Sequence, residues 1–562
     1  MTTLLATSKK VQFSSKHQEI TASAHFRLMI LLLLFLAAFT IIIGRLLSFS
    51  IFEETEAPAK LSTMLTPARG DIVDRNGVAL ARTMQGYAIR VVPSKILGDK
   101  RQIAKQLAVI FPDTSEEIFY KKLLASDPSY LRRRAVPNEV KKVHALGEIA
   151  IEFPRENERL YPQRDLAAHV LGYVNADGHG VLGMERALNK QLEDVSLRSQ
   201  PSVLSIDSRV QAALESELMS AMTVNGARGA AGIILDVNTG EVLALSSLPV
   251  FDPNKIRSDM MQNQTNEVTQ SVFELGSTFK ALTFAAALDA GTVSDLAVRY
   301  NAMEPIKIAG FTIKDDHSSG RYLNVPEALV HSSNIVTARV ADNLGKERME
   351  HMIRSLGFDE RPHIELAERG KPLWPKSWGR VTNMTIGYGH GIAVTPLHLA
   401  SAYAALVNGG IWRPATLLKV EPGKEAKGRR VFKAATSARM RQLLRMIVSN
   451  GTGRKADAPG YRIGGKTGSA EKPSNGGYAK SSIVATFAAA FPMDNPRYVV
   501  IAMLDEPKGR ADTGYQRTAG WTAAPIVRNV VQRIGPMLGI VPDEHRDVDV
   551  SELMPLLWSP KG

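Results

Sequence analysis

The feature that most constrains this chain is a charge-free apolar run near its start. No charged residue occurs from Leu28 to Gly44, and after Arg45 the run continues as LLSFSIF. These roughly 20 to 24 residues, at about 1.5 Å per helical residue, can cover a hydrocarbon layer of about 30 Å. We predict a transmembrane anchor over residues 28–48. A cleavable signal peptide is disfavoured, because the run is long and the nearest small-residue site, Ala57-Pro58-Ala59, lies too far downstream.

The charges on either side of the run predict its orientation. The preceding flank is basic and the following flank is acidic: Lys9, Lys10, Lys16 and Arg27 come before the run, and Glu53, Glu54 and Glu56 come after it. Since basic flanks stay on the cytoplasmic side, residues 1–27 should form a cytoplasmic tail and the rest of the chain should face outward. Arg45, at the outer end, is expected to snorkel to the interface. A single span argues against a channel or a transporter.

The composition narrows the classes of function. With 44% hydrophobic and 22% charged residues in a chain of 562, the outward part can fold as ordinary globular domains. The chain has no cysteine, so disulfides, thiolate nucleophiles and cysteine-ligated zinc are excluded. The formal charge of +13 comes from basic residues scattered among acids, so nucleic acid is not an expected partner.

No cofactor and no metal site are expected. Asp315-Asp316-His317 resembles a metal cluster, but it lies in a turn-like stretch where three adjacent side chains cannot all face one ion. His179 and His390 lie in glycine-flanked loops, where a structural role is more common than a catalytic one. Of the two, His390 keeps a candidate place in the wall of a cleft.

The outward part divides by pattern into a linker and two folded regions. Residues 49–60 contain the polar stretch EETEAPAK, which is typical of a linker. Residues 61–202 mix strand-like runs such as YAIRVVP with helical stretches such as EEIFYKKLLAS, and they hold no visible catalytic constellation. We predict a mixed α/β pedestal domain there. A second domain over residues 203–545 opens with a helical pattern, and residues 546–562 form a C-terminal tail.

The second domain is predicted to be of the α+β class. AAGIILDVNTGEVLALSS contains two apolar runs around Asn238-Thr239-Gly240, which is the turn chemistry of a β-hairpin. Two more strands are predicted in SSIVATFAAAFP and RYVVIAMLDEP, and the patterns between are mostly helical. The last helix, in TAAPIVRNVVQRIG, could pack back on the sheet. We therefore expect an antiparallel sheet flanked by helices, with a cleft between the sheet and the helical part.

A serine and a lysine stand three residues apart at the head of a long apolar run. After Ser277 the run TFKALTFAAALDAG is apolar nearly all round and ends at Gly291, which predicts a buried helix with a glycine C-cap. The free N–H groups of its first turn would favour negative charge near the serine oxygen. Lys280 falls on the same face one turn later. Taken alone the motif is short, because serine is also a common N-cap.

Two further elements make the pattern specific. Ser332-Ser333-Asn334 lies inside a helical pattern, where a local break would present Ser332 and Asn334 together. Lys466-Thr467-Gly468-Ser469 comes just before a strand that begins near Ser482, and its glycines would permit close approach of a ligand to the backbone. Ser-x-x-Lys, Ser-x-Asn and Lys-Thr-Gly in this order form the motif set of serine β-lactamases and penicillin-binding proteins.

These motifs lie within a longer resemblance. The chain resembles the class B penicillin-binding proteins, which are membrane-anchored peptidoglycan D,D-transpeptidases, and most closely their septal, FtsI-type members. Four more stretches are similar to that family: RGDIVDRNG, RLYPQRDLAAHVLGYVNADGHGVLGMERALN, ILDVNTGEVLALSSLPVFDPN and IGYGHGIAVTPLHLASAYAALVNGG. Leu275 stands where a proline is usual and His390 where a glutamine is frequent, but neither departure removes a chemical group.

The resemblance implies a nucleophile and a base. Ser277 would attack the carbonyl between two terminal D-alanines, form an acyl-enzyme and expel one D-alanine. A serine hydroxyl needs a neighbouring base. Lys280 would be that base if burial and the positive charge of Lys466 lower its pKa. Ser332 would relay the proton to the leaving amine. The base for the second step, attack by the acceptor amine, is left open.

The remaining motif residues are implied to bind the substrate. Asn334 would hold the donor peptide. Lys466, with the hydroxyls of Thr467 and Ser469 on either side of Gly468, would bind the terminal carboxylate. Backbone N–H groups of the nucleophile and of Ser469 would stabilise the oxyanion.

Partners and location are also implied by the resemblance. Peptidoglycan stem peptides would be the substrates and β-lactams the inhibitors. No glycosyltransferase pattern is visible, so an FtsW-type glycosyltransferase and other division proteins are expected partners. The protein would be anchored in the bacterial inner membrane at the division site, with its catalytic domain in the periplasm.

Other functions remain as alternatives. An elongation-type class B transpeptidase shares the motifs but tends to have a larger pedestal. A β-lactamase would lack the anchor and residues 61–202. A D,D-carboxypeptidase would more often end in an amphipathic anchor, which SELMPLLWSPKG does not provide.

Overall fold

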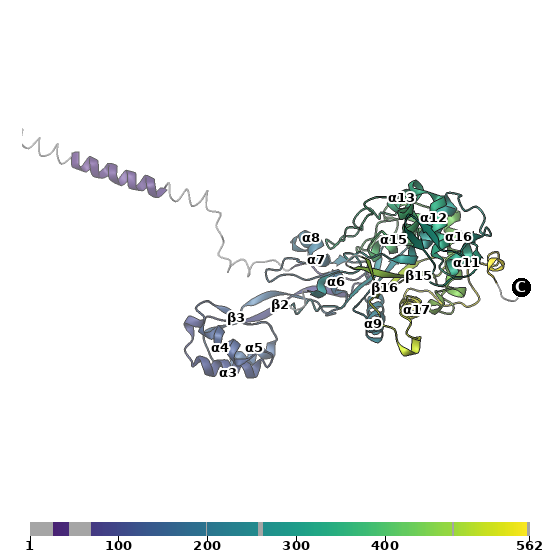
Figure 1. Cartoon of the computed structure of the whole chain (residues 1–562). Helices are drawn as coiled ribbons and strands as arrows, with labels where there is room; N and C mark the ends of the chain where they lie inside the picture. Colours follow the sequence, from purple (N-terminus) through teal and green to yellow (C-terminus); the bar gives the residue numbers. More distant parts are fainter. Residues whose placement is uncertain (1–25, 44–68, 198, 257–261, 475–476, 559–562) are drawn as a thin grey trace, which may run out of the picture. The chain divides into compact units, whose positions relative to one another are not determined.

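The chain forms two compact units, Met1–Thr66 and Pro67–Gly562. The computed structural model in Figure 1 describes residues 26–43, 69–197, 199–256, 262–474 and 477–558. Most of the predicted cytoplasmic tail, the linker 49–60 and Arg45 lie outside the described residues.

The described part of the first unit is one helix, Phe26–Ile43. It has 18 residues with a mean hydropathy of 2.8, so it is long and apolar enough to cross a membrane. It coincides with most of the predicted span 28–48, whose end after Ile43 lies outside the described residues. The helix fits a single-pass membrane anchor.

The second unit begins with a mixed α/β region, as predicted. Its sheet has the order β3-β2-β1-β6, and two further short strands pair with β2; only β1 and β6 run parallel. The strands are β1 (Ile72–Val73), β2 (Ala79–Val91), β3 (Ser129–Ala135), β4 (Ile151–Glu152), β5 (Arg155–Leu160) and β6 (Ser202–Val203). Helices α3 (Lys100–Ile110), α4 (Glu116–Leu124) and α5 (Pro137–His144) pack near β3 around a core that includes Phe111 and Phe119 (Figure 1).

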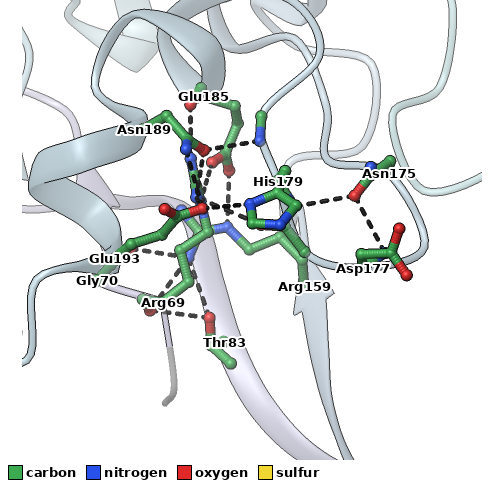
Figure 2. Close-up of polar contacts among 12 residues, drawn as sticks. Arg69, Gly70, Thr83, Arg159, Asn175, Asp177, His179, Glu185, Asn189 and Glu193 are labelled. Carbon is green, nitrogen blue, oxygen red and sulfur yellow. Dashed lines mark hydrogen bonds and ion pairs between the residues drawn. The ribbon is translucent and has the colours of Figure 1, made fainter. Parts of the chain in front are cut away.

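A buried charge cluster joins three stretches of this region. The side chain of Glu185 has no exposed surface, and its carboxylate accepts hydrogen bonds from Arg69 Nε and Arg159 Nε, both at 2.6 Å (Figure 2). Glu193 also pairs with Arg69, at 3.5 Å, but its side chain is 40% exposed. The helices here are α6 (Ala168–Leu171), α7 (Gly183–Ala187) and α8 (Asn189–Glu193). Residues from RGDIVDRNG, RLYP and GMERALN therefore meet around one carboxylate.

An antiparallel sheet of five strands, in the order β15-β16-β17-β7-β8, forms the centre of the second domain. The strands are β7 (Gly229–Asp236), β8 (Val242–Leu248), β15 (Gly464–Ser474), β16 (Gly477–Phe491) and β17 (Tyr498–Asp505). The predicted hairpin and the two late strands are confirmed. Lys466–Ser469 lie within the edge strand β15, which precedes β16, the strand predicted near Ser482.

Helices cover both faces of this sheet because its side chains alternate between two apolar cores. Ile233 faces the core that holds α10, α15 and α16, whereas its neighbour Ile234 faces the core of α9 and α17. The covering helices are α9 (Ser208–Val224), α10 (Phe279–Asp289), α15 (Pro396–Val407), α16 (Ala434–Asn450) and α17 (Ala523–Met537). As predicted, the last helix packs on the sheet.

Shorter elements surround this frame. The remaining helices are α11 (Val325–Val330), α12 (Asn334–Leu344), α13 (Lys346–Ser355) and α14 (Arg380–Gly387). The short strands form three pairs: β9 (Tyr300–Asn301) with β12 (Tyr322–Leu323), β10 (Ile306–Ile308) with β11 (Phe311–Ile313), and β13 (Ile411–Trp412) with β14 (Arg429–Arg430).

From the charge cluster in Figure 2 we predict how two substitutions change the free energy of unfolding. Replacing Glu185→Ala leaves two buried guanidinium groups without their carboxylate, so the free energy of unfolding should fall by about 3–5 kcal/mol. Glu193→Ala removes a half-exposed partner of the same arginine and should cost within about 1 kcal/mol. Denaturant unfolding of the detergent-solubilised protein measures both values. Equal losses for the two variants would contradict the assignment of Glu185 as the central anion.

Candidate active site

Ser277 lies in a short 3₁₀ turn, Gly276–Thr278, and α10 begins two residues after it, at Phe279. The prediction placed Ser277 in the first turn of the α-helix itself. The rest of that prediction is confirmed: α10 is buried over most of its length, and Gly291, with φ of +71°, follows its end. The serine therefore precedes a rigid apolar helix.

The turn that carries Ser277 packs tightly between two other backbone segments. A Cβ atom on Gly276, whose φ is +54°, would lie 3.0 Å from the carbonyl oxygen of Ser469 on β15. A Cβ on Gly468 would lie 2.4 Å from the carbonyl oxygen of Leu275, and one on Gly389 would lie 2.1 Å from that of Gly276. The space at Gly468 thus admits the turn that carries Ser277, whereas the sequence suggested that the glycine would permit close approach of a ligand.

Lys280 follows on the first turn of α10, with no exposed surface. Its Nζ donates hydrogen bonds to the carbonyl oxygen of Ser332 at 2.5 Å and to the Ser332 hydroxyl at 3.1 Å. The apolar surroundings of α10 explain its burial. The lysine therefore has polar partners only at its tip.

Ser332 lies in the break between α11 and α12, as the sequence predicted. Its φ of +59° is in the left-handed region, which non-glycine residues seldom adopt. The next residue, Ser333, caps α12 by accepting a hydrogen bond from Val336 N at 3.1 Å. The break turns the Ser332 side chain towards Lys280.

Lys466 approaches the same hydroxyl from the edge strand of the sheet. It also has no exposed surface, and its Nζ donates to Ser332 Oγ at 2.8 Å. Further acceptors are the carbonyl and hydroxyl oxygens of Thr467, at 3.2 and 3.3 Å. One serine hydroxyl therefore accepts hydrogen bonds from two buried lysines that lie 186 positions apart in the sequence numbering, at 280 and 466.

Burial is the main influence on both lysines. It lowers the pKa of Lys280 to about 7, although the carboxylates of Asp315 and Asp316 oppose the shift. Burial also lowers the pKa of Lys466 well below its usual value, and the charge of Lys280 lowers it further. We expected the charge of Lys466 to lower the pKa of Lys280. Instead, the charge of Lys280 lowers the pKa of Lys466. A neutral Lys280 is accessible near pH 7.

The sequence did not reveal the role of Asp315. Its Oδ2 accepts a hydrogen bond from Ser333 Oγ at 2.8 Å, and its Oδ1 accepts one from Ile335 N at 2.9 Å. The carboxylate thus holds the turn that carries Ser332. The sequence offered only the adjacent acids as a signal, and these were considered for a metal cluster and rejected.

The other predicted residues lie along the rim of the same site. Thr467 Oγ1 lies 2.9 Å from Thr452 Oγ1, and the exposed Ser469 accepts a hydrogen bond from Ala519 N at 3.0 Å. Asn334 Nδ2 donates to the carbonyl oxygen of Lys314 at 2.9 Å. Thr452 is a neighbour that sequence analysis missed, because its position after α16 gives no local signal.

His390 follows Gly389, which lies against the turn that carries Ser277. Its Nδ1 is 3.0 Å from Glu274 Oε2, and the other oxygen of Glu274 accepts from Gly391 N at 3.0 Å. The residue before His390, Gly389, packs against the carbonyl of Gly276 in the turn that carries Ser277. The His390 side chain is 33% exposed, and the predicted place of His390 in the wall of a cleft stays a prediction.

This arrangement suits acyl transfer. A serine stands at the start of a helix, a lysine with a pKa near neutrality lies one turn on, and a second serine connects that lysine to a second buried lysine. Hydroxyl groups on the edge strand can receive a carboxylate. These are the groups that a covalent serine mechanism uses.

Comparisons with known proteins agree with this chemistry. The penicillin-binding protein transpeptidase domain matches residues 230–532, and the penicillin-binding protein dimerisation domain matches residues 64–200. The chain is 39% identical over 483 residues to the probable peptidoglycan D,D-transpeptidase FtsI of Caulobacter vibrioides, covering 84% of this chain and 82% of that protein. It is 28% identical over 529 residues to the peptidoglycan D,D-transpeptidase FtsI of Escherichia coli, covering 87% of each.

A solved structure has the same architecture. Penicillin-binding protein 3 of Mycobacterium tuberculosis, complexed with aztreonam, superposes with a TM-score of 0.67 at 27% identity, over 85% of this chain and 98% of that one. The matches thus extend across both folded regions. The chain belongs to the class B penicillin-binding proteins, as a peptidoglycan D,D-transpeptidase of the FtsI type.

Proposed function

We propose that Ser277 is the acylated nucleophile of a transpeptidase that cross-links stem peptides during division. Its Oγ attacks the carbonyl carbon between the two terminal D-alanines, and Lys280 accepts the hydroxyl proton. The bond to the last D-alanine breaks, and the proton passes through Ser332 to the leaving amine. The stem peptide is left as an ester on Ser277. An acceptor amine then attacks this ester and frees the serine.

The observation that carries the proposal is the shared hydrogen bonding of Ser332 Oγ to Lys280 and Lys466. A hydroxyl between two amines with lowered pKa values can pass a proton in either direction. Lys466, Thr467 and Ser469 lie on one strand and supply an amino group and two hydroxyls for the terminal carboxylate of the donor.

We also propose roles for the other predicted residues. Asn334 holds the donor peptide, and the backbone N–H groups of Ser277 and Ser469 stabilise the oxyanion. A Cβ added to Gly276, the residue before Ser277, would lie 3.0 Å from the Ser469 carbonyl oxygen, which supports the closeness of Ser277 and Ser469. Gly468 keeps the strand near the nucleophile turn.

The proposed location is the division site, with the catalytic domain in the periplasm. The basic flank before the span supports a cytoplasmic N-terminus. The relatives named FtsI favour division over elongation. Since the two matched domains are a transpeptidase and a dimerisation domain, the glycan strands would be made by another protein, and we propose an FtsW-type glycosyltransferase as that partner.

The first prediction concerns the nucleophile. Ser277→Ala should abolish covalent labelling by a fluorescent penicillin and leave the melting temperature unchanged, because only the bonding oxygen is lost. Ser220→Ala, an exposed serine on α9, is the matched control and should label as the wild type does. Labelling of Ser277→Ala at the wild-type rate would overturn the assignment.

The second prediction concerns the base. Lys280→Ala should slow acylation by at least about 10²-fold, the usual weight of a general base. Exposed Lys307→Ala is the control. In the wild type, acylation should require neutral Lys280, so its rate should be constant above a pKa of about 7 and fall as pH drops below it. Stopped-flow measurement of the acylation rate between about pH 5 and pH 9 tests both points. A rate independent of pH would contradict the assignment of Lys280 as the base.

The third prediction concerns the place of action. Depletion of the protein should give filamentous cells blocked in division, and a fluorescent fusion should gather at mid-cell. Microscopy during depletion checks both. Swollen or rounded cells that still divide would instead indicate an elongation enzyme.

A further inference from the structure

The last described segment of the chain, residues 546–558, packs against the catalytic domain. We call it the C-terminal strap; the sequence predicted it only as a tail. It lies along α16, where side chains three residues apart hold it at successive turns. Arg445 pairs with Asp547 at 2.8 Å, Gln442 Nε2 donates to the Asp549 carbonyl at 2.7 Å, and Arg439 donates to Glu552 at 3.4 Å.

The strap also enters the apolar core. Leu553 is 2% exposed and belongs to the core cluster that contains α10, α15 and α16. Further apolar residues of the strap pack on the same cluster: Val548, Val550, Leu556 and Leu557. Its position is therefore fixed by apolar burial as well as by surface ion pairs.

The end of the strap meets the capping residues of α11. Asn324 and Glu327 form a capping box at the start of this helix, and both are buried. Asn324 Nδ2 donates to the Leu556 carbonyl at 2.7 Å, and Trp558 N donates to Glu327 Oε1 at 3.1 Å. The Arg321 guanidinium pairs with the same Glu327 oxygen at 2.6 Å and lies 5.1 Å from the centre of the Trp558 ring.

The other end of α11 leads directly into the active site. Ser332 N donates to the Leu329 carbonyl at 3.2 Å, so the strained turn of Ser332 is built on the last turn of this helix. The Val330 carbonyl accepts from Thr452 N at 3.3 Å, and Thr452 bonds Thr467. The strap thus binds α11 and α16, and both helices run to residues that surround the lysine pair.

We propose that the C-terminal strap is a positioning element for the reaction: by fixing α11 it holds the Ser332 hydroxyl between Lys280 and Lys466. This inference rests on the proton-relay role proposed for Ser332. The strap contacts described above go to α16, the start of α11 and Arg321, not to Ser277. Loss of the strap should therefore slow acylation, whereas the strand that receives the carboxylate stays in place.

The test uses the full detergent-solubilised protein and a chain that ends at Leu553. This shortening keeps Leu553 and the three polar contacts to α16 described above, but it removes the Leu556 carbonyl and the Trp558 amide from α11. A chain that ends at Trp558 is the matched control. Stopped-flow labelling with a fluorescent penicillin measures the limiting acylation rate, the half-saturating concentration and the fraction labelled.

We expect the limiting rate of the chain ending at Leu553 to fall by about 10- to 100-fold, the cost of a misplaced catalytic group. The half-saturating concentration should stay within about twofold, and labelling should still reach completion. The control should match the full chain. An unchanged limiting rate would overturn the proposal. So would a smaller labelled fraction that reacts at the full rate, because that result would mean the strap only stabilises the fold.

A double-variant cycle separates this inference from the proposed function. Ser332→Ala should slow acylation in the full chain, and the shortening should then add little, because both changes act through one group. Additive losses would overturn the positioning role. If Ser332→Ala itself reacts at the wild-type rate, the proposed relay fails instead. Should the shortened chain not fold, Leu553→Ala, which loosens the strap without removing it, is expected to lower the limiting rate in the same way.

Discussion

The active site depends on one side-chain oxygen, Ser332 Oγ, which accepts hydrogen bonds from two lysines that have no exposed surface. A buried ammonium group is unfavourable unless it is paired, and two of them side by side repel each other. The acceptors nearest to them are hydroxyl and carbonyl oxygens, which carry no full negative charge. Helix α10, strand β15 and the turn after α11 are thereby tied together, because displacing any of them leaves a buried amine without its acceptor.

In the pedestal domain, buried charges are compensated by a charge of opposite sign. Around Glu185, two guanidinium groups flank a carboxylate, so each buried charge faces one of opposite sign (Figure 2). The short hydrogen bonds of this cluster hold three chain segments in place. Around Ser332 the compensation is incomplete, and the amines gain access to the neutral form that a base requires. Both sites bury charged side chains. Where the partner has the opposite charge, the site holds the fold together, and where the partner is uncharged, the buried amine can become a base.

Sequence analysis anticipated the elements whose signals are local. The apolar periodicity after Ser277, the Asn-Thr-Gly hairpin and the break at Ser332 each show in a short stretch, and each is present in the structure. The signals that failed are those set by tertiary contacts. Nothing near Asp315 indicates that its carboxylate accepts bonds from Ser333 and Ile335, since the loop brings them together only in the fold. The same holds for Thr452, and for Lys466, whose strand forms the edge of the sheet only because β16 pairs with it.

The turn that carries Ser277 is enclosed by backbone at Gly276, Gly389 and Gly468, where an added Cβ would lie 2.1 to 3.0 Å from a carbonyl oxygen. Any other residue at these positions would place its Cβ against a backbone carbonyl oxygen, which cannot move aside as a side chain can. These three glycine positions therefore disfavour any larger residue. Selection by β-lactams, which must spare the reaction with the natural peptide, has to work on other positions. The route to drug resistance is in this sense narrowed by the packing of three glycines.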